Sequence, residues 1–338
     1  MSFGGDVYAA SATVLRMLQG LHVSRAIYVA AKLGIPDLLA HGPATSDELA
    51  RHTDTHPRSL YRILRLLAAL GVLVESETQR FALTPLGECL RTGVPNSLHE
   101  WATQLDGLGG LRPFDEILTA VRSGAPSLNH VLGTDWLTHL TAHPDIARTF
   151  QASMSERTAA IAPTIAAAYD FEAVDTIIDV GGGRGTLLAT ILSAHPRLRG
   201  VLYELPVVIA NPEPILRECA RCDIVAGDFF TSVPSGGDAY ILANVLHDWD
   251  DADCIRILRC CRRAMSSGAK ILVIERMITN DPVQSLPTLL SDLHMMVLTG
   301  GMERTHDEYG RLFTEADLAL TRDVPVRPPF AIFEASSQ

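Results

Sequence analysis

The most constraining feature of this sequence is a glycine-rich turn that joins a short apolar strand to a helix. The run Asp179–Gly185 (DVGGGRG) follows residues 176–178, and apolar residues then recur at helical spacing from Leu187 to Leu192. Glycine adopts positive φ without strain and lets a ligand approach the backbone closely. Because the first turn of the helix also has free N–H groups, we expect this segment to bind a nucleotide-like ligand.

The glycine pattern differs from two common phosphate-binding motifs. A dinucleotide fingerprint (GxGxxG) would need a glycine where this sequence has Thr186, and the GK[ST] of a Walker loop is absent. Carboxylates follow the next two strands instead. Glu204 can accept hydrogen bonds from both hydroxyls of a ribose, and the pair Asp228-Phe229 can hold an adenine amino group and ring. The order of these residues predicts a ligand that contains adenosine.

Strands and helices alternate from about residue 172 onward. We expect strands at 176–180, 200–204, 223–226, 239–243 and 270–275, helices at 186–194, 213–220, 251–265 and 285–299, and two final strands around Pro325–Pro329. Alternating βα units of this kind predict an α/β fold with a doubly wound, mostly parallel sheet.

The amino-terminal half predicts a different, mostly helical unit. Residues 7–40 are helical and apolar, which fits either a subunit interface or a core helix. Residues 45–83 then follow the order helix, turn, helix, two-stranded hairpin, which is typical of a winged helix. A winged helix can bind DNA, but 28 basic and 39 acidic residues give a net charge of −11. The charge argues against nucleic acid as the main partner and favours a scaffold that packs or dimerises.

Composition bounds the remaining possibilities. A hydrophobic content of 47% in 338 residues supports two domains with buried cores. The N-terminus lacks the basic segment of a signal peptide, and we see no apolar run of about 18 residues, so we expect a cytoplasmic protein without a membrane span. The pairs Cys219/Cys222 and His139/His143 lack further ligands at metal-binding spacing, so no metal is expected.

Several motifs together make this chain resemble a known family. The chain resembles the S-adenosylmethionine-dependent O-methyltransferases of the plant caffeate and bacterial antibiotic-tailoring type. The matching segments are Asp179–Gly185, residues 203–206 (YELP), 227–229 (GDF), 244–249 (NVLHDW) and 300–305 (GGMERT). The resemblance implies a Rossmann-like class I methyltransferase sheet of seven strands, the last antiparallel, over residues 156–338. It also implies a winged-helix-like dimerisation domain over residues 1–155 that helps to close the substrate pocket.

The resemblance implies a general base at His247, flanked by Glu275 and Glu303. A phenol has a pKa near 10, so its deprotonation at neutral pH needs a base. A histidine with an ordinary pKa near 6.5 is neutral there and can take the proton. One of the two glutamates would orient the imidazole ring and stabilise its protonated form.

The resemblance also implies the residues that bind the two substrates. The expected cofactor-binding residues are Gly181, Gly183, Glu204, Asp228, Phe229 and Thr158. Two positions depart from the family pattern: Ala243 stands where a basic residue is common, and Glu204 where aspartate is usual. The acceptor candidates are mostly apolar and suit a flat aromatic molecule: Met154, Phe150, Trp136, Asp292, Met296 and Met302.

The sequence therefore predicts a homodimeric enzyme that methylates a hydroxyl of an aromatic secondary metabolite and releases S-adenosylhomocysteine. One alternative is a relative that keeps the cofactor but hydroxylates or decarboxylates a polyketide. A second alternative, from another class of protein, is a winged-helix regulator that only binds the cofactor.

Overall fold

The computed structural model describes residues 3–210 and 212–337 and divides into two compact units, which meet between Gln104 and Leu105. The sequence predicts a domain boundary at 155/156 instead. That position lies inside the continuous helix α12 (Pro144–Ala168), which packs with the second unit. The change near residue 172, from helices alone to alternating strands and helices, therefore marks the start of the sheet rather than the boundary between the units.

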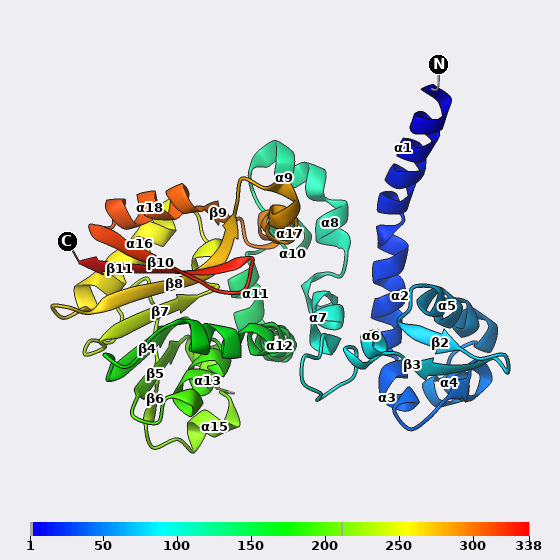
Figure 1. Ribbon diagram of the computed structural model, residues 1–338, viewed down its shortest axis with the longest axis horizontal. Helices are drawn as coiled ribbons and strands as arrows, with labels where there is room; N and C mark the ends of the chain where they lie inside the picture. The colour runs from blue at the N-terminus through cyan, green and yellow to red at the C-terminus, as the bar shows by residue number, and fades with distance from the viewer. Residues whose placement is uncertain (1–2, 211, 338) are drawn as a thin grey trace. The chain divides into compact units, whose positions relative to one another are not determined.

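The first unit is mostly helical (Figure 1). Its apolar core forms between helices and a small sheet in which β3 is central, with strand order β1-β3-β2. The sequence analysis expected only the hairpin of the last two strands. The elements are α1 (Phe3–Leu18), α2 (Gly20–Lys32), α3 (Ile35–Leu39), β1 (Ala44–Thr45), α4 (Ser46–Thr53), α5 (Pro57–Ala69), β2 (Leu73–Glu75), β3 (Arg80–Leu83), α6 (Pro85–Glu88) and α7 (His99–Thr103).

Local sequence signals explain the helix–turn–helix segment of this unit. Thr45 and Glu48 form a reciprocal capping box at the start of α4. Pro57 occupies the first turn of α5, where its missing N–H costs nothing, and Gly71 follows the helix with a φ of 77°. The expected winged-helix order is therefore present. Apolar side chains stay exposed on α1 and α2, namely Val14, Leu15, Met17, Leu18 and Leu21.

The second unit opens with short helices that end in α12. Glycines and prolines set their limits: Gly109 and Gly110 adopt positive φ, Pro126 precedes α10, and Pro144 begins α12. The elements are η1 (Gln104–Leu108), α8 (Arg112–Asp115), α9 (Ile117–Ser123), α10 (Ser127–Leu132), α11 (Trp136–Ala142) and α12.

The large sheet of the second unit has the order β10-β11-β8-β7-β4-β5-β6 (Figure 1). Its strands are β4 (Thr176–Val180), β5 (Arg199–Glu204), β6 (Cys222–Ala226), β7 (Ala239–Ala243), β8 (Lys270–Ile278), β10 (Leu318–Pro325) and β11 (Phe330–Ser337). The four inner pairings between β6 and β8 are parallel, whereas β11 is antiparallel to both β8 and β10. The expected seven-stranded sheet with an antiparallel last strand is confirmed. The two-residue strand β9 (Arg304–Thr305) pairs with the end of β8.

Helices cover both faces of this sheet and bury two apolar clusters. Side chains of α12 and of α13 (Thr186–Ala194) pack on one face, and those of α16 (Asp251–Ala264) and α18 (His306–Glu315) pack on the other. Shorter elements are α14 (Pro206–Ile209), α15 (Pro214–Arg217) and η2 (Leu246–Asp248), and α17 (Pro282–Leu298) follows β8. The parallel strands thus end together at one edge of the sheet, where such folds bind ligands.

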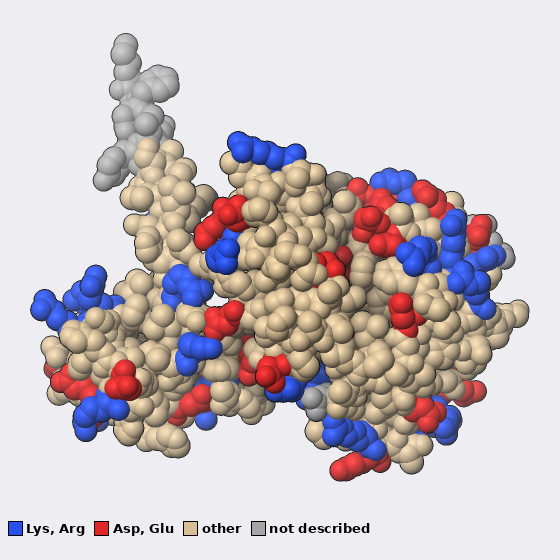
Figure 2. All heavy atoms as spheres, turned by 180° about the vertical axis from the view of Figure 1, so that it is seen from behind, with Lys and Arg blue, Asp and Glu red and all other residues tan. Residues whose placement is uncertain are grey.

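Two further expectations concern the surface. No helix in the described part of the chain is both long and apolar enough to cross a membrane. On the face drawn in Figure 2, basic and acidic side chains are interspersed, and no continuous basic surface is visible there.

Candidate active site

The glycine turn after β4 has the backbone that its sequence predicts. Gly181, Gly183 and Gly185 all have positive φ, at 71°, 59° and 84°. Gly182 needs its lack of a side chain for another reason, since a Cβ there would collide with the carboxylate of Asp179. The N–H of Gly181 donates to the carbonyl of Tyr203, which ties the turn to the end of β5. This hydrogen bond fixes the position of the turn at the carboxyl edge of the sheet.

Two buried carboxylates lie beneath and beside this turn. Glu204 accepts hydrogen bonds from the N–H groups of Gly183 at 3.0 Å and Leu205 at 2.7 Å. Asp179 is 1% exposed, and neither of its carboxylate oxygens has a hydrogen-bond partner among the described residues. Burial and the neighbouring Glu204 raise the pKa of Asp179 to about 7, and burial also raises the pKa of Glu204. These oxygens fit a ligand with hydroxyl and ammonium donors, as S-adenosylmethionine has.

A single cavity in the second unit brings most of the expected site residues together. Its walls run from the glycine turn to the loop after β7 and include one face of α12. The cavity is lined by these expected residues: Trp136, Phe150, Met154, Thr158, Gly181, Gly183, Glu204, Asp228, Phe229 and His247.

Three acceptor candidates do not line this cavity. Asp292 accepts a hydrogen bond from the N–H of Glu303 at 2.9 Å, Met296 packs in an apolar cluster, and Met302 is 43% exposed. For Asp292 and Met296, the orientation of α17 explains the difference, because this helix turns His294 and Met295 toward the cavity instead. The helical periodicity of residues 285–299 does not reveal which face of the helix meets the cavity. The sequence alone therefore could not distinguish Met295 from Met296.

The cavity also has lining residues that the sequence analysis did not select. Polar examples are Gln151, Arg157, Asn244, Arg276 and His294. Gln151 and Arg157 lie on α12, the helix that also carries the expected residues Phe150, Met154 and Thr158. Helical spacing from those three residues would have identified both. Arg276 directly follows Glu275 on β8. No sequence motif marks His294.

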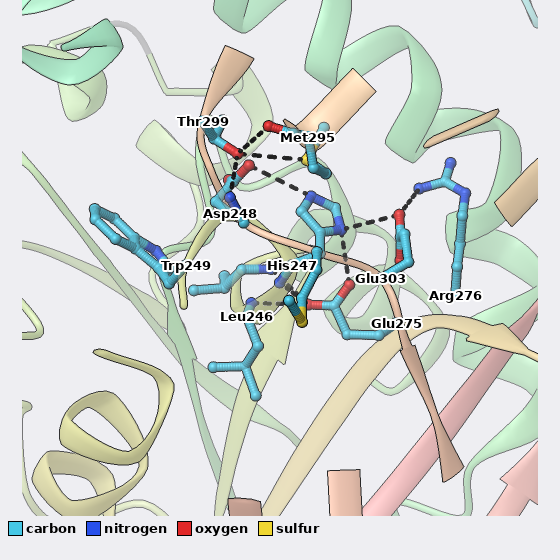
Figure 3. A network of polar contacts seen from close by, with 12 residues as sticks. Leu246, His247, Asp248, Trp249, Glu275, Arg276, Met295, Thr299 and Glu303 are labelled. Carbon is cyan, nitrogen blue, oxygen red and sulfur yellow. Dashed lines mark hydrogen bonds and ion pairs between the residues drawn. The ribbon is translucent and has the colours of Figure 1, made fainter. Parts of the chain in front are cut away.

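A tightly held backbone turn carries His247. Oε1 of Glu275 accepts the N–H groups of Val245 at 2.9 Å and Leu246 at 2.8 Å. Arg304, 1% exposed, donates to the carbonyls on either side of the histidine, Leu246 at 3.1 Å and Trp249 at 2.9 Å. Figure 3 shows the turn with Glu275 beside it. The carboxylate of Glu275 thus holds the N–H groups of the turn, and the guanidinium of Arg304 holds its carbonyl groups.

The backbone of the GGMERT segment also packs against this turn. A Cβ on Gly301 would collide with the carbonyl oxygen of His247, so only glycine fits there. Arg304 gains its own anchor from Asp251, whose Oδ1 lies 3.0 Å from Nε and 2.7 Å from Nη2. The two sequence motifs that carried the resemblance therefore form one structural unit around the histidine.

The imidazole of His247 lies among three carboxylates (Figure 3). Nδ1 is 2.9 Å from Oε2 of Glu275 and 3.7 Å from Oε1 of Glu303, and Nε2 is 3.7 Å from Oδ1 of Asp248. Burial lowers the pKa of His247, but the negative charges of Glu275, Asp248 and Glu303 outweigh burial and raise this pKa to about 9. The structure corrects the ordinary pKa near 6.5 that the sequence analysis assumed, because the sequence does not reveal how many carboxylates meet the ring.

The carboxylates respond to the same crowding. Burial raises the pKa of Asp248 to about 6, although the charge of His247 opposes the rise. Burial also raises the pKa of Glu303, and the charge of His247 opposes that rise. The guanidinium of Arg276 lies 3.9 Å from Oε1 of Glu303. This end of the cavity therefore balances its buried charges with cations of its own.

The residues around the histidine also have atoms of the kind that bind metals. One nitrogen of His247 and one oxygen each of Glu275 and Glu303 lie within 4.8 Å of one another. Oε1 of Glu275 is already committed to backbone N–H groups, and basic side chains neutralise the cluster. The arrangement fits control of a proton on the imidazole, and no metal is assigned to it.

Comparison with known proteins agrees with this geometry. Residues 15–93 match the O-methyltransferase dimerisation domain, and residues 114–319 match the O-methyltransferase domain. The chain is 40% identical over 328 residues to phenazine O-methyltransferase PhzM of Lysobacter antibioticus, and the match covers 96% of each protein.

Solved structures give the same family. The mitomycin 7-O-methyltransferase MmcR superimposes with a TM-score of 0.92 at 37% identity, covering 99% of both chains. NcsB1, an O-methyltransferase from neocarzinostatin biosynthesis, was solved with S-adenosylmethionine and 2-hydroxy-5-methyl naphthoic acid. Its TM-score is 0.83 at 33% identity, and the match covers 96% of this chain and 98% of that one.

The relatives do not all share one reaction. Aclacinomycin 10-hydroxylase RdmB of Streptomyces purpurascens is 37% identical over 326 residues, covering 92% of this chain and 85% of that protein. The O-methyltransferase domain nevertheless spans most of the chain, and the first unit matches the dimerisation domain of the same enzymes. This chain belongs to the S-adenosylmethionine-dependent O-methyltransferase family, among relatives that tailor bacterial antibiotics.

Proposed function

We propose that the chain methylates a hydroxyl of an aromatic secondary metabolite and that His247 is the general base. The observation that carries this proposal is the contact of Nδ1 with Glu275 at 2.9 Å, because it leaves Nε2 as the nitrogen that can accept a proton. His247 lines the cavity, so a hydroxyl bound there can reach it. Glu275 orients the ring, and Glu303 stabilises its positive charge.

The cofactor-binding half of the cavity has a separate task. S-adenosylmethionine supplies a methyl group on a positively charged sulfur, which is already an activated leaving group. We assign its methionine end to the glycine turn and Asp179, and its ribose hydroxyls to Glu204. Asp228 and Phe229 would hold the adenine, and Thr158 on α12 would contribute from the opposite wall.

Proton transfer from a phenol to His247 is only slightly unfavourable in this arrangement. A phenol has a pKa near 10, and the carboxylates raise the pKa of His247 to about 9 despite burial. An imidazole with that pKa is a stronger base than an ordinary one, so the transfer costs about 1 kcal/mol or a little more. The apolar walls formed by Trp136, Phe150 and Met154 would exclude water and orient the acceptor.

The proposed acceptor class rests on the cavity and on the relatives. The cavity is lined by aromatic and methionine side chains, which suit a flat ring. PhzM is named for a phenazine, and NcsB1 was solved with a hydroxylated naphthoic acid. We therefore propose that the acceptor is a hydroxyl group on a single aromatic ring or on a system of fused aromatic rings.

We also propose that the active form is a homodimer in the cytoplasm. The first unit matches a dimerisation domain, and its first two helices expose the apolar stripe Val14, Leu15, Met17, Leu18 and Leu21. A stripe of this size on one helical segment favours burial against a second copy.

Hydroxylation or decarboxylation of a polyketide is the second candidate, favoured by the similarity to RdmB. We rank it second because removing a proton from a neutral hydroxyl explains the buried His247, Glu275 and Glu303 together. A regulator that only binds the cofactor would not need this base.

Two measurements test the proposal. S-adenosylhomocysteine should raise the melting temperature of the protein, and no shift at millimolar ligand would contradict every cofactor-dependent function. His247→Ala should lose about 10²- to 10⁴-fold in kcat on a neutral phenol and keep its affinity for S-adenosylhomocysteine. The control His41→Ala changes an exposed histidine of the first unit and should retain full turnover. Unchanged turnover in His247→Ala would exclude the general base.

A further inference from the structure

One residue of the cavity has a backbone conformation that most residue types avoid. Asn244 directly follows β7 and has a φ of 52°, in the left-handed region. Five of the described residues other than glycine have a positive φ, and among them only Asn244 lines the cavity. Most side chains are strained at such a φ, whereas glycine accepts it freely and asparagine tolerates it. A left-handed residue three positions before the proposed base therefore calls for an explanation.

The left-handed residue ends a strand and begins the turn that carries His247. The N–H of Asn244 still donates to the carbonyl of Ile274 at 3.0 Å, which continues the pairing of β7 with β8. Val245 then has a right-handed conformation, with φ and ψ of −114° and −49°. A left-handed residue followed by a right-handed one points successive N–H groups into one concavity that suits an anion. The change of hand at Asn244 thus aims the next N–H groups at the side chain that follows Ile274 on β8.

That side chain is the carboxylate of Glu275, which is 0% exposed. Its Oε1 accepts the N–H groups of Val245 at 2.9 Å and Leu246 at 2.8 Å. The N–H of His247 is 3.4 Å from the same oxygen. The other oxygen, Oε2, is 2.9 Å from Nδ1 of His247 (Figure 3). One carboxyl group therefore holds both the backbone of the turn and the imidazole that the turn carries.

We propose that Asn244 is a positioning residue for the base. Its left-handed conformation shapes the concavity of N–H groups that binds Glu275, and Glu275 in turn sets the position of the His247 ring. The role belongs to the backbone of Asn244, and the residue type matters because it permits that conformation. The inference rests on the proposed methyl transfer and adds a residue that acts on the base without contacting the proton.

The charges around the imidazole give this role a measurable consequence. Burial lowers the pKa of His247, but the charges of Glu275, Asp248 and Glu303 raise it to about 9. Basic side chains of neighbouring elements complete the surroundings, namely Arg157 of α12, Arg276 of β8 and His294 of α17. Glu275 acts on the ring through its 2.9 Å contact. A displaced turn should lengthen that contact and lower the pKa of His247.

The test compares substitutions that differ in their tolerance of a positive φ. Asn244→Gly and Asn244→Ala both remove the carboxamide, but only glycine adopts the left-handed conformation without strain. Asn244→Val introduces a β-branched side chain and should be the most strained of the three. NMR titration of the His247 imidazole, in the full-length protein saturated with S-adenosylhomocysteine, measures the pKa without turnover, and His247→Gln identifies the signal. The pKa should fall by about half a unit in Asn244→Ala, fall further in Asn244→Val, and stay within about 0.2 units in Asn244→Gly.

Turnover and a matched control complete the test. On a neutral phenol, kcat should fall about tenfold in Asn244→Ala and further in Asn244→Val, and Asn244→Gly should recover most of that loss. Asn96 is an exposed asparagine of the first unit with a φ of 59°. Asn96→Ala therefore imposes the same backbone strain away from the cavity, and it should change neither the pKa of His247 nor kcat.

The outcomes separate this inference from the proposed function. Equal losses in Asn244→Gly and Asn244→Ala would show that the carboxamide itself acts, and would overturn the inference. An unchanged pKa of His247 in a folded Asn244→Val would overturn it as well. If Asn244→Val does not fold, the comparison of the glycine and alanine substitutions decides. Retained turnover in His247→Ala would instead contradict the proposed base, and the NMR titration would still report whether Asn244 positions the ring.

Discussion

Two pairs of buried carboxylates near the candidate active site differ in how their charge is balanced. Glu275 and Glu303 surround His247 and lie beside Arg276, so basic side chains of the protein neutralise them. Asp179 and Glu204 lie under the glycine turn, and neither forms an ion pair within the described part of the chain. Burial and Glu204 raise the pKa of Asp179 to about 7, which reflects the cost of that unbalanced charge.

The difference indicates which parts of the site are complete before ligands bind. The cluster around His247 has its charges and its backbone hydrogen bonds in place, as expected of a catalytic group that must be preorganised. In the proposed function, the pair under the glycine turn obtains positive charge and hydroxyl donors from the cofactor. Substitutions at the first cluster should change turnover, and substitutions at the second should change cofactor affinity and the stability of the unliganded protein.

Arg304→Met should show the largest difference between the two pairs of carboxylates, because it should lower stability and kcat without lowering cofactor affinity. This substitution removes the charged donor of two carbonyls in a buried turn, those of Leu246 and Trp249. The weak thiol donor of Cys254 remains for both carbonyls, and the N–H of Trp249 remains for Leu246. We expect a loss of about 3 kcal/mol in the free energy of unfolding, measured by urea denaturation, and a fall in kcat of about 100-fold at a temperature where the variant is folded.

Cofactor binding serves as the internal control for Arg304→Met. The dissociation constant of S-adenosylhomocysteine should stay within about threefold, because Asp179 and Glu204 do not contact this arginine. Arg256→Met on the neighbouring helix, where the side chain is 60% exposed, should leave both stability and kcat nearly unchanged. A variant of Arg304 that loses cofactor affinity as strongly as kcat would show that the two halves of the site are not independent.

The sequence predicted the scaffold of both regions better than their charges. Apolar periodicity and glycine or proline breaks located β4, α13 and β7 to the residue, because local patterns specify those elements. The motif around His247 and its two glutamates also came together as expected. The pKa of His247 could not be predicted, because Asp248, Glu275 and Glu303 approach the ring from three different segments.

The part of the cavity that we propose for the acceptor, near Trp136, Phe150 and Met154, was the least predictable. Which residues of α17 face the cavity depends on the rotation of that helix, and one position decided between Met295 and Met296. Arg157 and Arg276 carry no motif that marks them as ligand-binding residues. They line the cavity only because the fold brings α12 and the end of β8 together.

Asp179→Asn tests the pair under the glycine turn. A carboxyl group with a raised pKa in the folded state binds more protons than in the unfolded state between about pH 4 and 7. Its contribution to stability therefore falls as the pH rises through that range, and at pH 8 the ionised, buried group destabilises the unliganded protein. Asp179→Asn should melt several degrees higher than the original protein at pH 8, and the gain should shrink toward pH 5.

The same substitution should weaken cofactor binding about 10- to 100-fold at pH 8, because the carboxylate can no longer pair with an ammonium group. Calorimetry with S-adenosylhomocysteine measures this loss, and Asp223→Asn, at a 71% exposed side chain on β6, is the control. A variant that binds S-adenosylhomocysteine normally would show that Asp179 has a structural role alone.

The smallest expected effect is a shift in pH dependence from Glu303→Gln. The carboxylates around His247 raise its pKa to about 9 against the effect of burial, so the neutral base is scarce at pH 7 and kcat/KM should rise with pH up to about 9. Removing the charge of Glu303, 3.7 Å from Nδ1, should lower that pKa and move the midpoint of the profile by about one unit toward acid. Glu315→Gln on α18 lies outside the cavity and should leave the midpoint unchanged. An unshifted midpoint in Glu303→Gln would mean that Glu275 and Asp248 alone raise the pKa of His247. The group of carboxylates that acts on the imidazole would then not include Glu303, despite its distance of 3.7 Å.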